Sequence, residues 1–270
     1  MRGVICALLL GALAGVGWAQ PPEGALPARI TRWLDGDTCM IRFTGPLPPG
    51  LSPNETVRLL GVNAPETGEA WAEEALRFFR SLTLAKPVYV ELNPRELRDA
   101  HRRLLAYLWV EGEEGWGLVN EQLLRAGLAR LLVFYPEQER YYCRFLRAVA
   151  LAQLEGLGLW ESAATPRALW EIEADPVRYV TQAVTVVFAV SRVGAEAQGW
   201  ALWAQGSRFG FRVLVQPALC PGFWALEGWD PSALVGKKLA VTGELSWDSL
   251  RNGPRILVHF PEQIRLWEGP

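Results

Sequence analysis

Two short polar segments contain residue types that can hold a hard cation. Asp35 and Asp37 flank Gly36, which lets the backbone turn so that both carboxylates can approach one point. Asn63 and Glu66 supply two further oxygen-bearing side chains. Oxygen donors of this kind are what calcium prefers, with roughly six to eight ligands. An isolated Asp-Gly-Asp is also typical of a hairpin turn with solvated acids, so the spacing alone leaves both interpretations open.

Two arginines add positive charge to this group. Arg58 and Arg103 each carry a planar guanidinium that can bind two oxygens of a phosphate and stabilise charge that builds up during phosphodiester cleavage. A carboxylate such as Glu66 can orient or deprotonate the attacking water. Taken singly, Arg58 is more typical of a solvated strand start, and Glu66 also fits an acid favoured by a helix dipole. The combination indicates phosphodiester hydrolysis.

The backbone between Arg58 and Asn63 sets a geometric condition for this hypothesis. The two positions differ by an odd number of residues, so a regular strand would direct their side chains to opposite faces. Gly61 lies between them and would have to permit a bulge or bend for both to reach one site.

Hydrophobic periodicity predicts the elements that position these residues. Strands are expected over 29–43, hinged at the Asp-Gly-Asp turn, and over 56–62, 88–92 and 104–110. Helices are expected over 67–82, 120–127 and 136–156, with Thr67 and Asn120 as N-caps. This order of elements is typical of an α+β fold that contains a small barrel.

A change of composition over 161–166 divides the chain. We expect a first domain over 26–162, a linker over 163–177 and a second domain over 178–270. Strands in the second domain are expected over 183–193, 199–204, 210–216, 238–245 and 256–260. Five strands with a helical insert at 230–235 suit a second, mostly-β barrel of the OB type. Its tryptophan and basic side chains could bind bases and phosphates, or could serve as core and solvated surface.

The stretch from Asp35 to Trp160 resembles the staphylococcal nuclease (thermonuclease) family. The matching pieces are Asp-Gly-Asp-Thr at 35–38, Val-Arg-Leu-Leu-Gly-Val-Asn-Ala-Pro-Glu at 57–66, Arg-Leu-Leu-Ala-Tyr at 103–107, Val-Asn-Glu-Gln-Leu-Leu-Arg-Ala-Gly-Leu-Ala at 119–129 and Gly-Leu-Trp at 158–160. They occur in the family's order and cover roughly half of the chain. The resemblance implies a five-stranded OB-fold barrel with three helices, which hydrolyses DNA and RNA with Ca²⁺ and leaves a 3′-phosphate.

The resemblance also implies a calcium site. Asp37 matches a direct ligand, Asp35 an acid that acts through water, and Ala64 a residue that offers its backbone carbonyl. Asn63 departs from the pattern, because the family usually has an aspartate there. An amide contributes a dipole where a carboxylate brings a full charge, so we expect weaker metal binding. Arg102 is a second departure, at a position where the family usually has glycine.

The remaining roles follow from the same matches. Arg58 and Arg103 match the two phosphate-binding arginines, and Glu66 matches the proposed general base. Tyr135 lies where the family places an aromatic residue near the bound base, and core packing is an equal alternative. His101 lies two residues before Arg103 and has no partner at metal-ligand spacing. We therefore interpret it as a surface or substrate-edge residue.

Bulk properties limit the partners and the location. The chain has 270 residues, half of them hydrophobic, and a net charge of −2, which argues against non-specific coating of nucleic acid. Residues 1–19 have the pattern of a cleaved secretory signal, with an apolar run shorter than the ~20 residues of a spanning helix. We therefore expect an exported monomer, secreted or in the periplasm or cell envelope, without stable membrane insertion. Cys39, Cys143 and Cys220 then allow one disulfide of undetermined pairing or three free thiols.

The sequence leaves three functional hypotheses. The first is an exported calcium-dependent nuclease acting on DNA and/or RNA. The second is a catalytically weak or inactive nucleic-acid-binding module of the same fold, which Asn63 favours and which the presence of Arg58, Glu66 and Arg103 opposes. The third is an envelope-associated interaction protein whose barrels bind protein or glycan.

Overall fold

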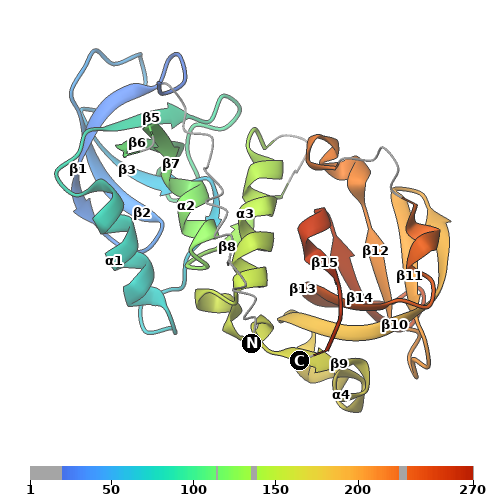
Figure 1. Ribbon diagram of the computed structural model, residues 1–270. Coiled ribbons are helices and arrows are strands. Elements are labelled where there is room, and N and C mark those ends of the chain that lie inside the picture. Colours follow the sequence, from blue (N-terminus) through green and yellow to red (C-terminus); the bar gives the residue numbers. More distant parts are fainter. Residues whose placement is uncertain (1–19, 114, 135–138, 225–229, 270) are drawn as a thin grey trace, which may run out of the picture.

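Two closed five-stranded barrels lie on either side of one long helix (Figure 1). The structure is a computed structural model that describes residues 20–113, 115–134, 139–224 and 230–269. The expected α+β architecture, with a five-stranded OB-like barrel and three helices followed by a second barrel, is confirmed. The expected signal segment 1–19 lies outside the described residues.

The first barrel is formed by strands β1, β2, β3, β5 and β6. Their bounds are Leu26–Trp33, Thr38–Phe43, Asn54–Leu59, Val88–Leu92 and Leu104–Gly112. β1, β2 and β3 form an antiparallel meander, and the barrel closes where β3 pairs with β6 in parallel. Alternate residues such as Cys39, Ile41 and Val57 point into the core, and β7 (Gly115–Leu118) extends β6 outward. The Cys39 thiol is free and buried.

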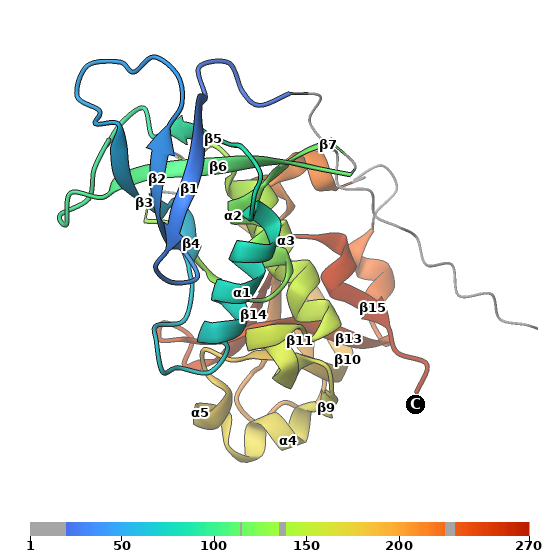
Figure 2. The same cartoon turned by 90° about the vertical axis from the view of Figure 1, so that its left-hand side faces the viewer.

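Three helices cover one side of this barrel (Figure 2). They are α1 (Ala72–Thr83), α2 (Val119–Arg125) and α3 (Tyr142–Glu155). The prediction that α1 begins after a Thr67 cap is wrong: a turn in which the Glu69 N–H donates to the Glu66 carbonyl precedes it, and the cap position is Trp71. Asn120 is likewise no cap, because it lies within α2 and is completely buried.

A small two-stranded sheet connects the first barrel to the helices. It pairs β4 (Gly61–Asn63) with β8 (Arg130–Leu132), and Asn63 stands directly opposite Arg130. Gly61 adopts a left-handed φ of 72° and separates β4 from β3. A side chain at Gly61 would also collide with Phe145, since a Cβ there would lie 2.5 Å from the ring. The bend predicted between Arg58 and Asn63 is therefore confirmed.

The second barrel is formed by β10, β11, β12, β13 and β14. Their bounds are Ala183–Glu196, Gly199–Ala204, Arg212–Val215, Lys238–Asp248 and Gly253–Val258. β10 pairs with β13 to close the barrel, and β15 (Ile264–Leu266) pairs with β13. The expected helical insert is a 3₁₀ turn, η5 (Pro231–Leu234).

The segment 163–177, which we expected to be a linker, is an ordered part of the second barrel. It contains β9 (Pro166–Ala168), which pairs with β10, and α4 (Leu169–Ala174), followed by α5 (Pro176–Tyr179). Leu169 and Ile172 are buried in the core of that barrel. The change of composition suggested a linker, but these two apolar side chains fix the segment on the barrel.

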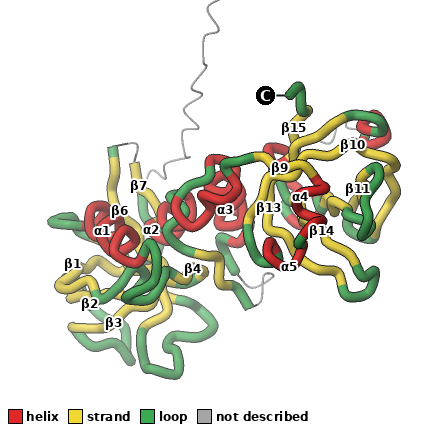
Figure 3. Tube along the Cα trace, turned by 90° about the horizontal axis from the view of Figure 1, so that it is seen from below, coloured by secondary structure: helices red, strands yellow, loops and turns green. Residues whose placement is uncertain are grey.

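The two barrels are joined by covalent and polar contacts through α3, which lies between them (Figure 3). Cys143 on α3 forms a disulfide with Cys220, with a Cα–Cα distance of 5.7 Å. This pairing answers the question that the sequence left open. The Arg147 guanidinium also pairs with the Glu262 carboxylate at 2.6 Å. Within the described residues, no helix has the length and apolarity needed to cross a membrane.

Candidate active site

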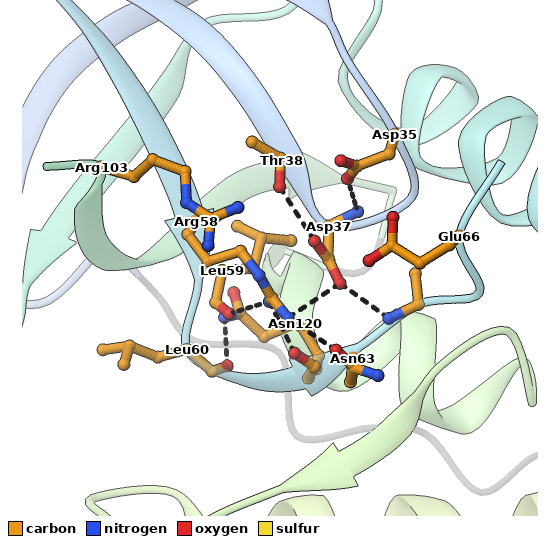
Figure 4. Close-up of polar contacts among 12 residues, drawn as sticks. Asp35, Asp37, Thr38, Arg58, Leu59, Leu60, Asn63, Glu66, Arg103 and Asn120 are labelled. Atoms are coloured by element: carbon orange, nitrogen blue, oxygen red, sulfur yellow. Dashed lines mark hydrogen bonds and ion pairs between the residues drawn. The ribbon is translucent and has the colours of Figure 1, made fainter. Parts of the chain in front are cut away.

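Arg58 is held in one orientation by the bend that follows β3. Its Nη1 donates to the backbone carbonyls of Leu59, at 2.8 Å, and Val62, at 2.6 Å. Its Nη2 donates to Asn63 Oδ1 at 2.9 Å and lies 3.1 Å from Asp37 Oδ2 (Figure 4). Because both backbone carbonyls accept from Nη1, Nη2 is free to contact the side chains of Asn63 and Asp37. Arg58, Asp37 and Asn63 are thus in direct contact, as the sequence predicted.

Asp37 is buried, with 6% of its surface exposed, and its carboxylate accepts hydrogen bonds from one side chain and one backbone N–H. Its Oδ1 accepts from the Thr38 hydroxyl at 3.0 Å, and its Oδ2 accepts from the Ala64 N–H at 2.7 Å. Asp35 Oδ1 accepts from the Asp37 N–H at 2.9 Å. Burial raises the pKa of the Asp37 carboxyl to about 6, although the Arg58 guanidinium favours the ionised form.

Gly36 is needed between the two aspartates for a reason that the sequence did not indicate. Its backbone does not adopt a left-handed φ. A Cβ at this position would lie 2.6 Å from the Ala64 Cβ and 2.7 Å from the Ala75 Cβ. The glycine therefore allows the Asp35–Asp37 turn to pack against the chain around Ala64 and against α1.

The oxygen donors at this turn fit a hard cation, with a low ligand charge. Asp37 Oδ2 and Asn63 Oδ1 both approach the same cationic nitrogen of Arg58, so they converge on one point. Their chemistry, carboxylate and amide oxygen, is that of calcium or magnesium ligands. Across the described parts of the chain, no three His, Cys, Asp or Glu side chains gather as a metal-binding group. Asn63 in place of an acid makes this set poorer in negative charge.

Arg103 lies at the start of β6 and is oriented by Asp99. Its Nε donates to Asp99 Oδ2 at 2.7 Å, and its backbone N–H donates to Asp99 Oδ1 at 2.9 Å. The preceding Arg102 has a left-handed φ of 64°, which explains why glycine is usual at this position in the family. Asp99 thus fixes both the backbone and the side chain of Arg103.

Arg58 and Arg103 line one cavity of about 450 Å³. Leu59, Val62, Leu105 and Leu132 contribute apolar walls. Tyr107 and Glu139 lie at the same cavity, where the Tyr107 hydroxyl donates to the Glu139 carboxylate. Two guanidiniums beside an apolar wall can bind a phosphate together with the sugar or base attached to it.

The other predicted residues differ in how they relate to this cavity. Glu66 is exposed, and its carboxylate is directed toward the Asp35–Asp37 turn (Figure 4). His101 is exposed, and its backbone N–H donates to Asp99, but it does not line the cavity. Tyr135 lies outside the described residues.

Two positioning residues were not predicted from the sequence. Asn120 donates from Nδ2 to the Leu60 carbonyl at 2.8 Å and accepts from the Leu108 N–H at 3.0 Å, so it ties the bend after Arg58 to β6. In the sequence it is one of several polar residues at the start of this helix, which also fits a cap and gives no sign of burial. Asp99 had a signal in its spacing, four residues before Arg103.

The fold and this site together define a barrel protein in which two arginines line one cavity, one of them paired with a buried carboxylate. Residues 56–162 match the family model described as staphylococcal nuclease homologue. The chain is 33% identical over 138 residues to the thermonuclease of Staphylococcus intermedius, which is 49% of this chain and 74% of that protein. It is 30% identical over 137 residues to the SPbeta prophage-derived endonuclease YokF of Bacillus subtilis, covering 48% of this chain and 43% of YokF. It is 28% identical over 156 residues to the endonuclease YncB of the same organism, covering 56% of this chain and 69% of YncB.

This chain belongs to the family of staphylococcal nuclease homologues. The match runs from β3 through the three helices to residue 162, so it leaves β1, β2 and the second barrel outside. The chain spans less than half the length of YokF.

Proposed function

We propose that the protein is an exported, calcium-dependent nuclease that hydrolyses phosphodiester bonds of DNA and/or RNA in the first barrel. Arg58 and Arg103 bind the scissile phosphate and stabilise the charge that develops on it. Glu66 orients or deprotonates the attacking water. The names of the relatives, endonuclease and thermonuclease, support this reaction class.

One observation carries the proposal. Arg58 contacts Asp37 and Asn63 on one side and lines the cavity that contains Arg103 on the other. A phosphate held by both guanidiniums would therefore lie next to the carboxylates. A structural ion pair would have no need for a second, separately fixed arginine at the same cavity.

Asp37, Asn63 and the backbone of Ala64 would hold the calcium ion, with Asp35 acting through water. When bound, calcium supplies positive charge that polarises a phosphoryl oxygen. The residues of the chain perform the remaining tasks: Asp37 and Asn63 orient Arg58, Asp99 orients Arg103, and Asn120 fixes the bend that brings β3 and β4 to one site.

Export is supported by the segment 1–19 and by the Cys143–Cys220 disulfide. Disulfides form and persist in oxidising compartments and are rare in reducing ones. The bond links α3 to the second barrel, so an oxidising location would stabilise the arrangement of the two barrels. We further propose that the mature chain acts as a monomer.

The test is degradation of denatured DNA and of RNA by the mature chain, with calcium and with a chelator. We expect calcium-dependent cleavage that Glu66→Gln and Arg103→Ala each reduce at least about a hundredfold. Arg102→Gly is the matched control, because it removes the neighbouring arginine and restores the residue that the left-handed backbone favours. Loss of activity in Arg102→Gly and not in Arg103→Ala would place the phosphate-binding arginine elsewhere.

A binding module without activity is the second candidate function. It is favoured by Asn63, whose neutral amide pairs with Arg58 where a carboxylate would attract a cation. Under this hypothesis the chain binds denatured DNA equally well with calcium and with chelator and does not degrade it. Cleavage in the first assay excludes it.

A further inference from the structure

The cleft between the two barrels has features of a binding site that the nuclease reaction does not use. Its volume is about 540 Å³, and its walls come from β8, α3 and Trp160 of the first domain and from the second barrel. It begins one strand away from the candidate active site, because Arg130 lines the cleft and stands opposite Asn63 in the β4–β8 pair. Directly opposed residues have Cβ atoms about 5 Å apart. A ligand in the cleft would thus be a neighbour of a phosphate at Arg58.

Two buried polar atoms in the walls have no hydrogen-bond partner among the described residues. One is Nε1 of Trp160, a side chain with only 3% of its surface exposed, and the other is Nδ1 of His259. Both side chains line the cleft. An indole N–H can only donate, and a buried polar group without a partner is costly, so Trp160 calls for an acceptor on a ligand.

A carboxylate and a guanidinium lie near these atoms. The Arg130 guanidinium stands over the Trp160 ring at 4.9 Å from its centre and forms no ion pair with another described residue. Glu244, on β13 of the second barrel, accepts no hydrogen bond from the described residues and faces the same cleft. Burial raises the pKa of its carboxyl, and Arg130 partly opposes this effect. Glu244 and Arg130 are exposed to solvent at this cleft and are available to a ligand, whereas the buried Trp160 N–H calls for an acceptor.

Apolar side chains form the rest of the walls. Leu131, Leu146 and Val149 come from the first domain, and Leu257 comes from the second barrel. A ligand that fits has apolar faces and an edge with both donors and acceptors. Nucleobases have this form, and guanine presents two adjacent N–H donors beside a carbonyl acceptor.

We propose that this cleft binds a guanine base of the nucleic acid whose phosphodiester lies at Arg58 and Arg103. Glu244 accepts from the two N–H groups of the guanine edge, while Arg130 and the Trp160 N–H donate to its carbonyl side. The second barrel thereby supplies part of the substrate-binding site. The link to a substrate rests on the proposed nuclease function, whereas base binding itself does not.

The experiment measures guanosine binding to the full mature chain by titration calorimetry in the presence of a chelator. Guanosine is the probe because it lacks the phosphate that Arg58 and Arg103 would bind. We expect one site, weakened about tenfold or more by Glu244→Gln and by Trp160→Phe, since each variant loses a hydrogen bond to the base. If Trp160→Phe fails to fold, Glu244→Gln decides the test.

Two controls separate this cleft from other sites. Glu196→Gln makes the same carboxyl-to-amide change on the second barrel, where Glu196 pairs with Arg251 and does not line the cleft, so guanosine binding should be unchanged. Arg103→Ala should also leave it unchanged. Guanosine binding that Arg103→Ala abolishes and Glu244→Gln does not affect would overturn the proposal, and so would absence of binding at roughly millimolar guanosine.

A kinetic measurement connects the cleft to the substrate. Glu244→Gln should raise KM for a single-stranded oligonucleotide that contains guanine, with kcat unchanged, and should leave KM for a guanine-free oligonucleotide unchanged. Equal KM changes for both oligonucleotides would contradict base recognition. Guanosine binding as described, in a chain that degrades no nucleic acid, would refute the nuclease function and leave the base site standing.

Discussion

Each barrel contains a buried aspartate that pairs with arginine, and the two clusters differ in how their charges balance. In the second barrel, Asp248 accepts from the guanidiniums of Arg212 and Arg255 and from two backbone N–H groups. In the first barrel, Asp37 has one guanidinium, that of Arg58, and a second acid, Asp35, beside it. One carboxylate with two cations makes a closed structural cluster. Two carboxylates with one cation leave a deficit of positive charge.

The pKa values of the two aspartates shift in opposite directions. Burial raises the pKa of Asp37 to about 6, and Arg58 offsets this only in part. Burial also opposes ionisation of Asp248, but two backbone N–H groups and two guanidiniums outweigh it and hold its pKa below the usual value. The first cluster is thus suited to bind a further cation beside its acids, while the second is suited to stabilise the fold.

Removing the arginine of the first cluster should have the largest effect on activity. We expect Arg58→Ala to reduce cleavage of denatured DNA about a thousandfold, because the transition state loses a fixed guanidinium. Arg58→Lys, which retains the charge and loses the two-nitrogen geometry, should have intermediate activity. The measurement is the rate at saturating calcium. Full activity in Arg58→Ala would show that the two clusters are functionally alike.

Removing an arginine of the second cluster should instead affect stability. Arg212 is buried, with 4% exposed, so Arg212→Ala should lower the free energy of unfolding by about 3–5 kcal/mol by leaving Asp248 undercompensated. Arg251→Ala is the matched control: its ion pair with Glu196 is exposed, and we expect a change within about 0.5 kcal/mol. Urea denaturation measures both. A thousandfold loss of activity in folded Arg212→Ala would contradict the assignment of a purely structural role.

The second barrel should also be the part that loses stability in mild acid. Burial lowers the pKa of His259 to about 4, from an ordinary value near 6.5. Below pH 6.5 the unfolded chain therefore binds more protons than the folded chain, and this stability is lost progressively as the pH falls toward 4. The loss attributable to His259 should be about 2 kcal/mol, and stability above pH 7 should not depend on it. His259→Gln should flatten this part of the urea-denaturation pH profile, and an unchanged slope would contradict the burial argument.

The sequence predicted that Asp37, Arg58 and Asn63 would lie together, because these motifs are local. The turn at Asp35–Asp37, the bend at Gly61 and the partnership of Arg58 with Asn63 all involve residues close in the chain or within one motif. The contacts that orient them were harder to predict. Asn120 donates a hydrogen bond to the carbonyl of Leu60, which lies 60 positions earlier in the chain. The side chain is buried, whereas the predicted helix cap would be exposed.

Long-range relations could not be predicted from the sequence. The pairing of Cys143 with Cys220 joins residues 77 positions apart, and spacing carries no information about it. The segment 163–177 contains prolines typical of a linker, yet Leu169 and Ile172 are buried by strands that follow later in the chain. The cleft at Arg130 and Glu244 exists only because two separately folded barrels meet at α3.

The smallest predicted effect is the most direct test of the charge deficit. Asn63→Asp would add a second carboxylate next to Asp37, with Arg58 still the only guanidinium between them. We expect the calcium concentration for half-maximal cleavage to fall about tenfold, because a full charge replaces a dipole at the ligand position. In chelator the same variant should be slightly less stable than the parent chain, since the added carboxylate increases the repulsion at the turn.

Glu69→Gln serves as the control for Asn63→Asp, because Glu69 lies near the site but accepts from the Glu66 backbone N–H rather than from Arg58. Its calcium dependence should match that of the parent chain. If Asn63→Asp left half-saturation unchanged while remaining folded, the cation would bind away from Asn63, and the charge deficit at this turn would not be what attracts it. If calcium affinity rose and stability in chelator fell together, one cause would explain both effects. That cause is the excess of carboxylates over guanidiniums, which the first cluster has and the second does not.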